Sequence, residues 1–104
     1  MTEVPDSPAV LSRFDLDRAW GVHPSVAVRP EPFGALLYHF GTRRLSFLKD
    51  PTLLVVVTTL SDHPSARAAL AATGADATQQ RRLARALATL ASTDMITERT
   101  EASP

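Results

Sequence analysis

The stretch that decides the fold is FGALLYHFGTRRLSFL, residues 33–48. Two runs of aromatic and aliphatic side chains flank Gly41-Thr42, and glycine at the first of two turn positions is typical of a type II′ hairpin. We therefore expect strands over residues 33–40 and 43–48, in a register that this turn fixes. In that register both strands place apolar side chains on one face, which carries Leu36, Tyr38, Leu45 and Phe47.

The segments on either side extend the hairpin into a sheet that is followed by a helix. Residues 25–29 are rich in β-branched side chains, which indicates another strand before the Pro30-Glu31-Pro32 break. Asp50-Pro51 is a typical N-cap and first helical residue, although the β-branched run after it would also suit a strand. A helical stripe favours the helix, and it consists of Leu53, Val56, Val57 and Leu60.

Capping patterns predict two more helices. Asp62 is expected to open a short helix that Gly74 closes. Asp76, with Gln79 three residues later, resembles a capping box, so the longest helix is expected over residues 77–92. The order predicts an α+β fold in which a three-stranded antiparallel sheet precedes three helices, as in a winged helix-turn-helix. The apolar stripe of the longest helix consists of Leu83, Leu87, Leu90 and Ala91.

Length and composition limit the classes of protein. The 104 residues suit one domain, which we place at residues 14–97 between disordered tails at 1–13 and 98–104. The chain has no cysteine, which excludes disulfides and thiolate metal sites. It shows no signal peptide and no run long enough to span a membrane, so we expect a cytoplasmic protein with no membrane partner. Residues 13–93 carry ten Arg/Lys against six Asp/Glu, and this mildly basic body suits an acidic peptide better than nucleic acid.

No pattern of reactive residues indicates catalysis. The histidines lack the i,i+4 spacing of a helical metal site, and no nucleophile or phosphate-binding motif occurs. The carboxylates are scattered singly at helix caps and in the tails, so no acid/base pair is evident. We therefore expect no enzyme activity, no metal and no cofactor. The three histidines are His23, His39 and His63.

The longest helix carries a cluster of three arginines, Arg81, Arg82 and Arg85, beside its apolar stripe. The cluster is either a solvated helix face or a surface that faces an anion. In a winged helix-turn-helix this helix would read DNA, so a small DNA-binding transcription regulator is the alternative function. The helix lacks the interleaved Asn, Gln and Lys side chains that base recognition normally uses.

The strand over residues 43–48 is the last in the predicted sheet, so one of its edges would carry unpaired N–H and C=O groups. Arg43, Arg44 and Lys49 are either the charges that protect this edge from association, or neighbours of a binding site. In the second case an extended peptide adds to the edge as a further strand. Its side chains would enter a groove between the apolar sheet face and the longest helix, with pockets from Leu83 and Leu87.

Several runs resemble a known family. RPEPFGALLYHF (29–40) and RRLSFL (43–48), with LDRAW (16–20) and Ala86-Leu87, resemble the peptide chaperone family of the mycofactocin system, MftB. The likeness covers about residues 14–96 and is most specific in the first hairpin. This family is similar to the peptide chaperone of pyrroloquinoline quinone biosynthesis. Both are precursor-peptide recognition elements with a winged fold of three strands and three helices.

The resemblance implies a non-catalytic adaptor without a cofactor, which captures the leader of a short precursor peptide and delivers it to a radical S-adenosylmethionine maturase. We expect these two partners and no nucleic acid, and either a monomer or a homodimer that pairs free edges. Arg43, Arg81 and Arg85 would form a basic rim that steers acidic leaders. In such elements the leader lies along the third strand against the third helix, which implies contacts with Arg44, Leu45, Ser46, Phe47, Leu48, Gln80, Leu83, Ala84 and Leu87.

Overall fold

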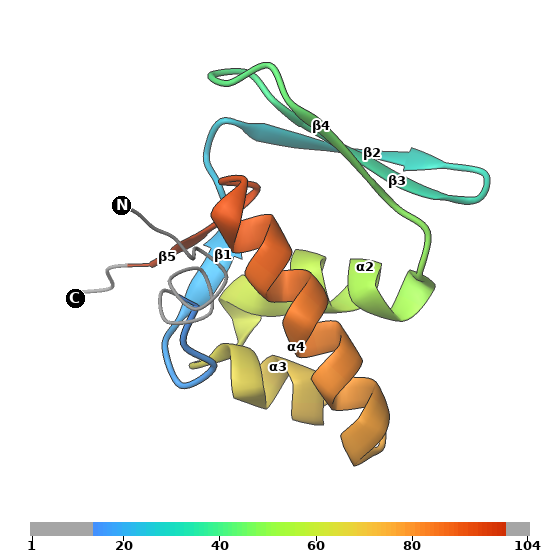
Figure 1. Ribbon diagram of the computed structural model, residues 1–104, viewed down its shortest axis with the longest axis vertical. Coiled ribbons are helices and arrows are strands. Elements are labelled where there is room, and N and C mark those ends of the chain that lie inside the picture. Colours follow the sequence, from blue (N-terminus) through green and yellow to red (C-terminus); the bar gives the residue numbers. More distant parts are fainter. Residues whose placement is uncertain (1–13, 100–104) are drawn as a thin grey trace, which may run out of the picture.

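The structure is a computed structural model that describes residues 14–99. A three-stranded sheet lies above three helices, and a two-stranded sheet closes one end of the domain (Figure 1). This order of strands and helices confirms the predicted α+β class. The elements are β1 (Trp20–Val22), β2 (Val26–Glu31), β3 (Gly34–His39), β4 (Leu45–Leu48), α2 (Pro51–Thr59), a 3₁₀ turn (Leu60–Asp62), α3 (Ala66–Ala71), α4 (Ala77–Ser92) and β5 (Ile96–Glu98).

The main sheet is antiparallel with β3 in the centre, between β2 and β4. The predicted register is confirmed, because Leu36 lies opposite Phe47 and Tyr38 lies opposite Leu45. Strand β2 continues through Pro30 to Glu31, two residues beyond its predicted end at Arg29 and into the predicted break. Proline is tolerated there because β2 is an edge strand, where a missing N–H leaves no partner unsatisfied.

The turn between β3 and β4 differs from the predicted type II′ turn. Positive φ falls on Arg43, at 64°, and not on Gly41. The Nδ1 atom of buried His39 accepts the N–H groups of Gly41 (3.0 Å) and Thr42 (3.1 Å), so a side chain organises a four-residue loop. The register survives because the His39 N–H still donates to the Arg44 carbonyl at 3.0 Å.

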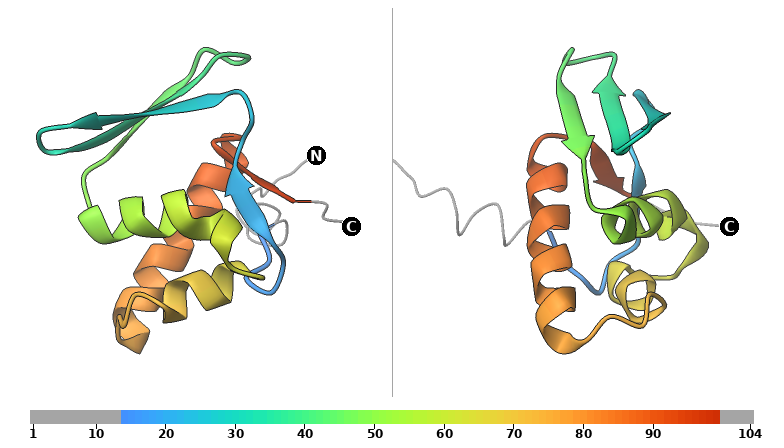
Figure 2. Two further views of the ribbon diagram at one scale, coloured as in Figure 1. Left: turned by 180° about the vertical axis from the view of Figure 1, so that it is seen from behind. Right: turned by 90° about the vertical axis from the view of Figure 1, so that its right-hand side faces the viewer.

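The apolar face of the hairpin points away from the helices, which corrects the expectation that it lines a groove with the longest helix. The opposite face, with buried Leu37, His39 and Leu48, packs on the core. Figure 2 shows the reason, because all three helices lie on one side of the sheet. Exposed fractions on the outer side are 84% for Phe33, 61% for Phe40, 61% for Leu45 and 49% for Phe47.

Helix α2 starts as predicted. The carboxylate of Asp50 accepts the Thr52 N–H at 2.9 Å, and Pro51 occupies the first turn. Arg82 of α4 donates to the same carboxylate at 2.9 Å, and this bond is the main cause that lowers the pKa of Asp50. The bond joins the start of α2 to α4. The predicted stripe of Leu53, Val56, Val57 and Leu60 is buried.

The two later helices agree with the prediction in part. Ser65 caps α3 by accepting the Ala68 N–H at 3.1 Å, so the predicted cap at Asp62 is wrong. Asp62 ends the preceding 3₁₀ turn instead. Helix α4 has the predicted bounds, and Asp76 accepts the Gln79 N–H at 2.8 Å.

A second sheet, β1 paired with β5, is missing from the sequence-based prediction. Trp20 of β1 is buried and its ring lies 4.8 Å from that of Phe14. Glu98, which we predicted to begin a tail, pairs with Trp20 in this sheet. The Arg99 guanidinium donates to the carbonyls of Trp20 (2.9 Å) and His63 (2.6 Å), which fixes the end of β5 to the domain.

Gly34 sets the distance between β3 and β4, and we expect Gly34→Ala to destabilise the domain. An alanine Cβ would lie 2.1 Å from the carbonyl oxygen of Leu48, a backbone atom, so β4 would have to move. Overpacking of this kind costs about 3 kcal/mol, which corresponds to a Tm lower by about 10 °C or more in thermal unfolding. Gly74→Ala is the control, because Gly74 also has positive φ, at 77°, but meets nothing within 4 Å. It should cost about 1 kcal/mol, and equal losses in the two variants would contradict this role of Gly34.

Candidate functional site

Strand β4 has one free edge. Among residues 14–99 its only neighbour in the sheet is β3. The His39–Arg44 hydrogen bond fixes which residues face β3, because antiparallel pairs alternate along the strands. By this alternation Ser46 and Leu48 bond to β3, whereas the N–H and C=O groups of Leu45 and Phe47 point to the free edge. These groups can pair with a further extended chain.

An open groove runs between this edge and the C-terminal half of α4. In the right-hand view of Figure 2, β4 is the strand of the main sheet on the same side as α4. The groove has a volume of about 340 Å³. Leu48 and Leu53 are buried at its base, and Ala86 and Thr89 expose part of their side chains along the wall. Its lining consists of Ser46, Phe47, Leu48, Leu53, Ala86, Thr89 and Leu90.

The structure brings only part of the predicted site to this groove. Ser46, Phe47 and Leu48 of β4 line it, while Arg44 and Leu45 are exposed beside it. On α4, Leu83 and Leu87 are buried in the core. Gln80 and Ala84 lie in a separate hollow of about 230 Å³ that faces α3. That hollow is lined by Leu16, Arg67, Leu70, Ala77, Gln80, Arg81 and Ala84.

Sequence reasoning missed the residues that form the helical wall of the groove. Ala86, Thr89 and Leu90 share a face because residues three and four apart in a helix are neighbours. Their signal in the sequence is weak, since alanine and threonine do not stand out beside a leucine stripe. Arg82 lies one turn before Ala86 on the same face of α4. Its bond to Asp50, which only the structure shows, therefore marks the face of α4 that lies next to the end of β4.

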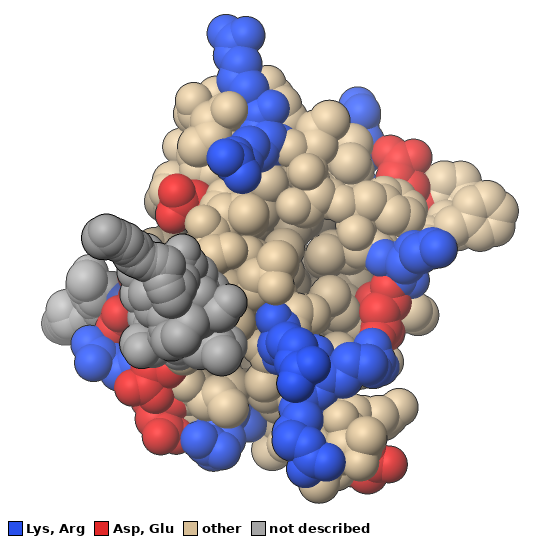
Figure 3. Space-filling model, viewed as in Figure 1, with Lys and Arg blue, Asp and Glu red and all other residues tan. Residues whose placement is uncertain are grey.

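Positive side chains surround the groove but leave it uncharged. Figure 3 shows them gathered over α4 and at the top of the molecule, with an uncharged surface between the two groups. Among the predicted rim residues, Arg43 and Arg85 are exposed, and Arg81 borders the hollow next to α3. Arg82 is held by Asp50 where β4 leads into α2.

Two of the three histidines, His23 and His39, have structural partners. The rings of His23 and His39 lie 4.5 Å apart, and the Nδ1 atom of His23 accepts the Ser25 N–H at 3.0 Å. Within the described part of the chain, no three His, Cys, Asp or Glu residues come together as a metal site requires. The groove therefore offers main-chain hydrogen bonds and apolar contacts to a ligand, and no acid/base pair. No helix within residues 14–99 has the length and hydrophobicity that crossing a bilayer requires.

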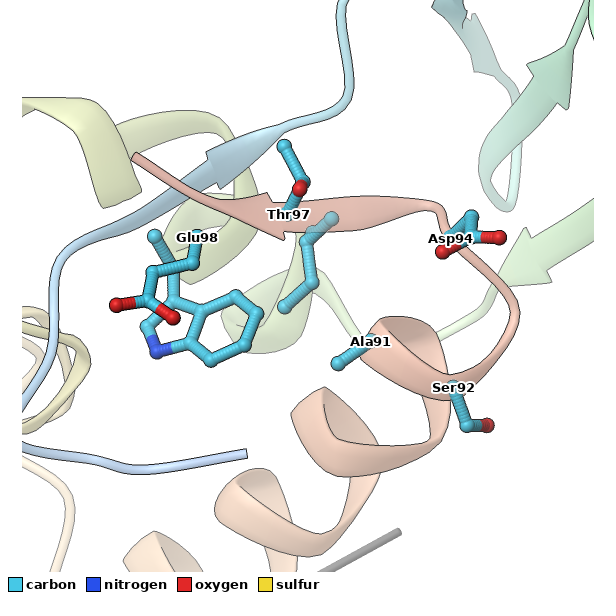
Figure 4. A pocket seen from close by; sticks show the side chains of 7 residues that line it. Ala91, Ser92, Asp94, Thr97 and Glu98 are labelled. Carbon is cyan, nitrogen blue, oxygen red and sulfur yellow. The ribbon is translucent and has the colours of Figure 1, made fainter. Parts of the chain in front are cut away.

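A third hollow, of about 230 Å³, lies at the other side of the domain between the end of α4 and β5. Figure 4 shows Ala91 and Ser92 of α4 beside Thr97 and Glu98 of β5 around it. The Glu98 carboxylate is paired with Arg18 at 2.6 Å, so it is not available as an isolated base. This hollow is separate from the edge of β4 and holds none of the predicted site residues.

Comparison with known proteins connects the chain to a family. The model of a family described as the peptide chaperone MftB family matches residues 19–97. A curated peptide chaperone MftB from Mycobacterium tuberculosis (strain ATCC 25618 / H37Rv) is 57% identical over 88 residues, which cover 85% of this chain and 81% of that protein. One from Mycolicibacterium smegmatis (strain ATCC 700084 / mc(2)155) is 57% identical over 83 residues, 80% of this chain and 81% of that protein. No solved structure matched the chain significantly.

Proposed function

The chain belongs to the peptide chaperone MftB family, and from this premise we propose that it binds a precursor peptide along β4 and delivers it to a radical S-adenosylmethionine maturase. As a peptide chaperone of mycofactocin biosynthesis it is not itself an enzyme. The observation that supports peptide binding most directly is the free edge of β4 beside an uncharged groove.

Strand addition is the binding mode that this geometry favours. An extended peptide would exchange main-chain hydrogen bonds with Leu45 and Phe47, whose N–H and C=O groups point to the free edge. Successive side chains of the added strand would alternate between the two faces of the sheet. One set would enter the groove against Ala86 and Thr89 and would supply the preference for one peptide sequence over another. Main-chain bonding would add affinity that depends little on the sequence.

The chaperone's contribution to the reaction is proximity. A peptide held on β4 reaches the maturase at a high effective concentration when both are bound to one chaperone. The domain needs no cofactor for this role.

The arginines of α4 support a peptide ligand over DNA. Arg82, the central member of the cluster, is bound to the Asp50 carboxylate at 2.9 Å and helps to anchor α2. The basic face that would read DNA is thereby reduced to Arg81 and Arg85. Two arginines form a small basic footprint compared with those of DNA-binding domains.

Two lysine substitutions on α4 test the proposed groove. Ala86→Lys places a long charged side chain in the groove, whereas Ala84→Lys places the same side chain in the hollow next to α3. We expect Ala86→Lys to lower affinity for the precursor peptide by about 30-fold or more, as a disrupted hot spot does. Ala84→Lys should keep affinity within about threefold, a change below 1 kcal/mol.

Isothermal titration with the synthetic precursor peptide encoded beside the gene gives both affinities, and a scrambled peptide serves as the ligand control. Equal helical circular dichroism in the two variants shows that both remain folded. If Ala84→Lys loses binding and Ala86→Lys retains it, the peptide contacts the helix face that the resemblance implied. If the unmodified protein binds the scrambled peptide equally well, peptide recognition itself is refuted.

A further inference from the structure

The outer face of the three-stranded sheet is an exposed apolar surface that shares only Phe47 with the groove. By the register, Leu36 and Tyr38 of β3 lie between β2 and the side chains of Leu45 and Phe47. Two phenylalanines extend this surface from the loops at its two ends. We call the outer face the surface formed by Ala27, Arg29, Glu31, Pro32, Phe33, Leu36, Tyr38, Phe40, Leu45 and Phe47.

The outer face has enough exposed apolar area, and enough surface relief, to bind another protein. Phe33, Phe40 and Phe47 are 84%, 61% and 49% exposed. At about 200 Å² for each phenylalanine side chain, these three expose roughly 400 Å² of apolar surface. Leu45, also 61% exposed, adds to this area. The largest apolar patch on a single domain is often functional, and patches larger than a few hundred Å² mark interaction sites. Two hollows of about 280 and 370 Å³ indent the face on either side of Leu36, so that it offers places for anchoring side chains.

Charge distinguishes between the possible occupants. The segment that forms the sheet, residues 26–49, carries four Arg or Lys side chains against one carboxylate, Glu31. Among the described residues none of the four has an ion-pair partner. The four cations are Arg29, Arg43, Arg44 and Lys49, and of these Arg44 lies opposite His39 and therefore belongs to the inner side of the sheet. Glu31 on β2 offsets the charge of Arg29 on the same face, which leaves Arg43 and Lys49 as the positive charges at the two ends of β4. A second copy seated on this face would bring these like charges together, which is unfavourable. The positive border is complementary in charge to a partner protein that has an apolar patch surrounded by carboxylates.

We propose that the outer face docks the maturase, through an apolar patch with an acidic border on that enzyme. The inference rests on the proposed function, because it assigns the surface for the second partner. Phe47 lines both the groove and one of the two outer hollows, so the two surfaces meet at β4. A peptide strand added to β4 would turn every second side chain toward the outer face. The docked enzyme would therefore contact the peptide while the chaperone still holds it.

The test measures two affinities, one for the maturase and one for the precursor peptide, in a double variant and in a control variant. The double variant Phe33→Ser/Phe40→Ser removes apolar surface at both ends of the outer face, and neither residue lines the groove. Val55→Ser is the matched control, because Val55 is 54% exposed but lies on α2. We expect the double variant to weaken binding of the purified maturase by about tenfold or more. Affinity for the precursor peptide should stay within about twofold in both variants, and Val55→Ser should leave maturase binding unchanged.

Equal maturase affinity in the double variant and the unmodified protein would overturn the proposal, as would a maturase that does not bind the unmodified protein. A dimer that becomes a monomer on Phe33→Ser/Phe40→Ser in sedimentation analysis would assign the face to a second copy instead. The proposed function fails separately, when the unmodified protein shows no preference for the precursor over the scrambled peptide. Maturase binding that also weakens with added salt would support the acidic border.

Discussion

Leu83→Asp is expected to unfold the domain at 25 °C. The Leu83 side chain is 1% exposed and belongs to the core that α4 forms with α2 and the sheet. An aspartate there would either bury an unpaired carboxylate or remain protonated in an apolar site, and both cost several kcal/mol. The small total stability of a domain of this size, about 5–15 kcal/mol, leaves little margin for that cost.

Leu83→Ala gives a measurable version of the same result. It should remain folded and lower the free energy of unfolding in urea by about 2–5 kcal/mol. Leu45→Asp is the control, because Leu45 is 61% exposed on the outer face and should change stability by less than about 1 kcal/mol. If Leu83→Asp unfolds at the same urea concentration as the unmodified protein, Leu83 is not a core residue and the helix is rotated from its described position.

The fold was predictable where local chemistry and long-range packing agree. The caps at Asp50 and Asp76 were confirmed because a carboxylate before a helix has a local partner, the N–H two or three residues later. The hairpin register was confirmed although the turn type was wrong, because the strand pattern fixed it independently. The turn was mispredicted because the organising acceptor is the ring of His39, a contact with no sequence signature.

Which face of the sheet packs against the helices could not be predicted from hydrophobicity. In the hairpin the outer face carries only apolar and aromatic side chains, such as Leu36 and Phe47, whereas the inner face mixes Leu37 and Leu48 with His39 and Ser46. Hydrophobic residues are normally placed inward, and that rule gives the wrong answer when an apolar face serves an interaction. The side that the helices cover is set by the path of residues 49–51 into α2, which depends on the fold as a whole.

The lining of the candidate groove was predictable on its strand side and not on its helix side. An edge strand follows from strand order, so the β4 residues were available from sequence. On α4 the leucines that dominate the sequence pattern are buried in the core. The exposed side chains that form the groove wall are small and do not stand out in the sequence, namely Ala86 and Thr89.

Phe47→Asp is expected to lose peptide binding without unfolding the domain. The ring is 49% exposed and lines the groove beside Leu48, Ala86 and Leu90, so it should be covered when a peptide binds. Covering about 100 Å² of apolar ring contributes about 2.5 kcal/mol. Its loss corresponds to a roughly 60-fold weaker peptide affinity. An aspartate would add a carboxylate that strand addition must desolvate, so the measured loss in titration calorimetry should be at least this large.

Phe33→Asp is the control that separates an effect in the groove from a general effect of added charge. Both substitutions exchange a largely exposed phenylalanine for a carboxylate on the same sheet, but Phe33 is absent from the groove lining. A general effect of added negative charge, or of a less apolar outer face, would weaken the peptide complex equally in both variants. Loss confined to Phe47→Asp would instead locate the peptide at the edge of β4. A folded Phe47→Asp protein with full peptide affinity would rule out this groove, because no strand could add to β4 without covering that ring.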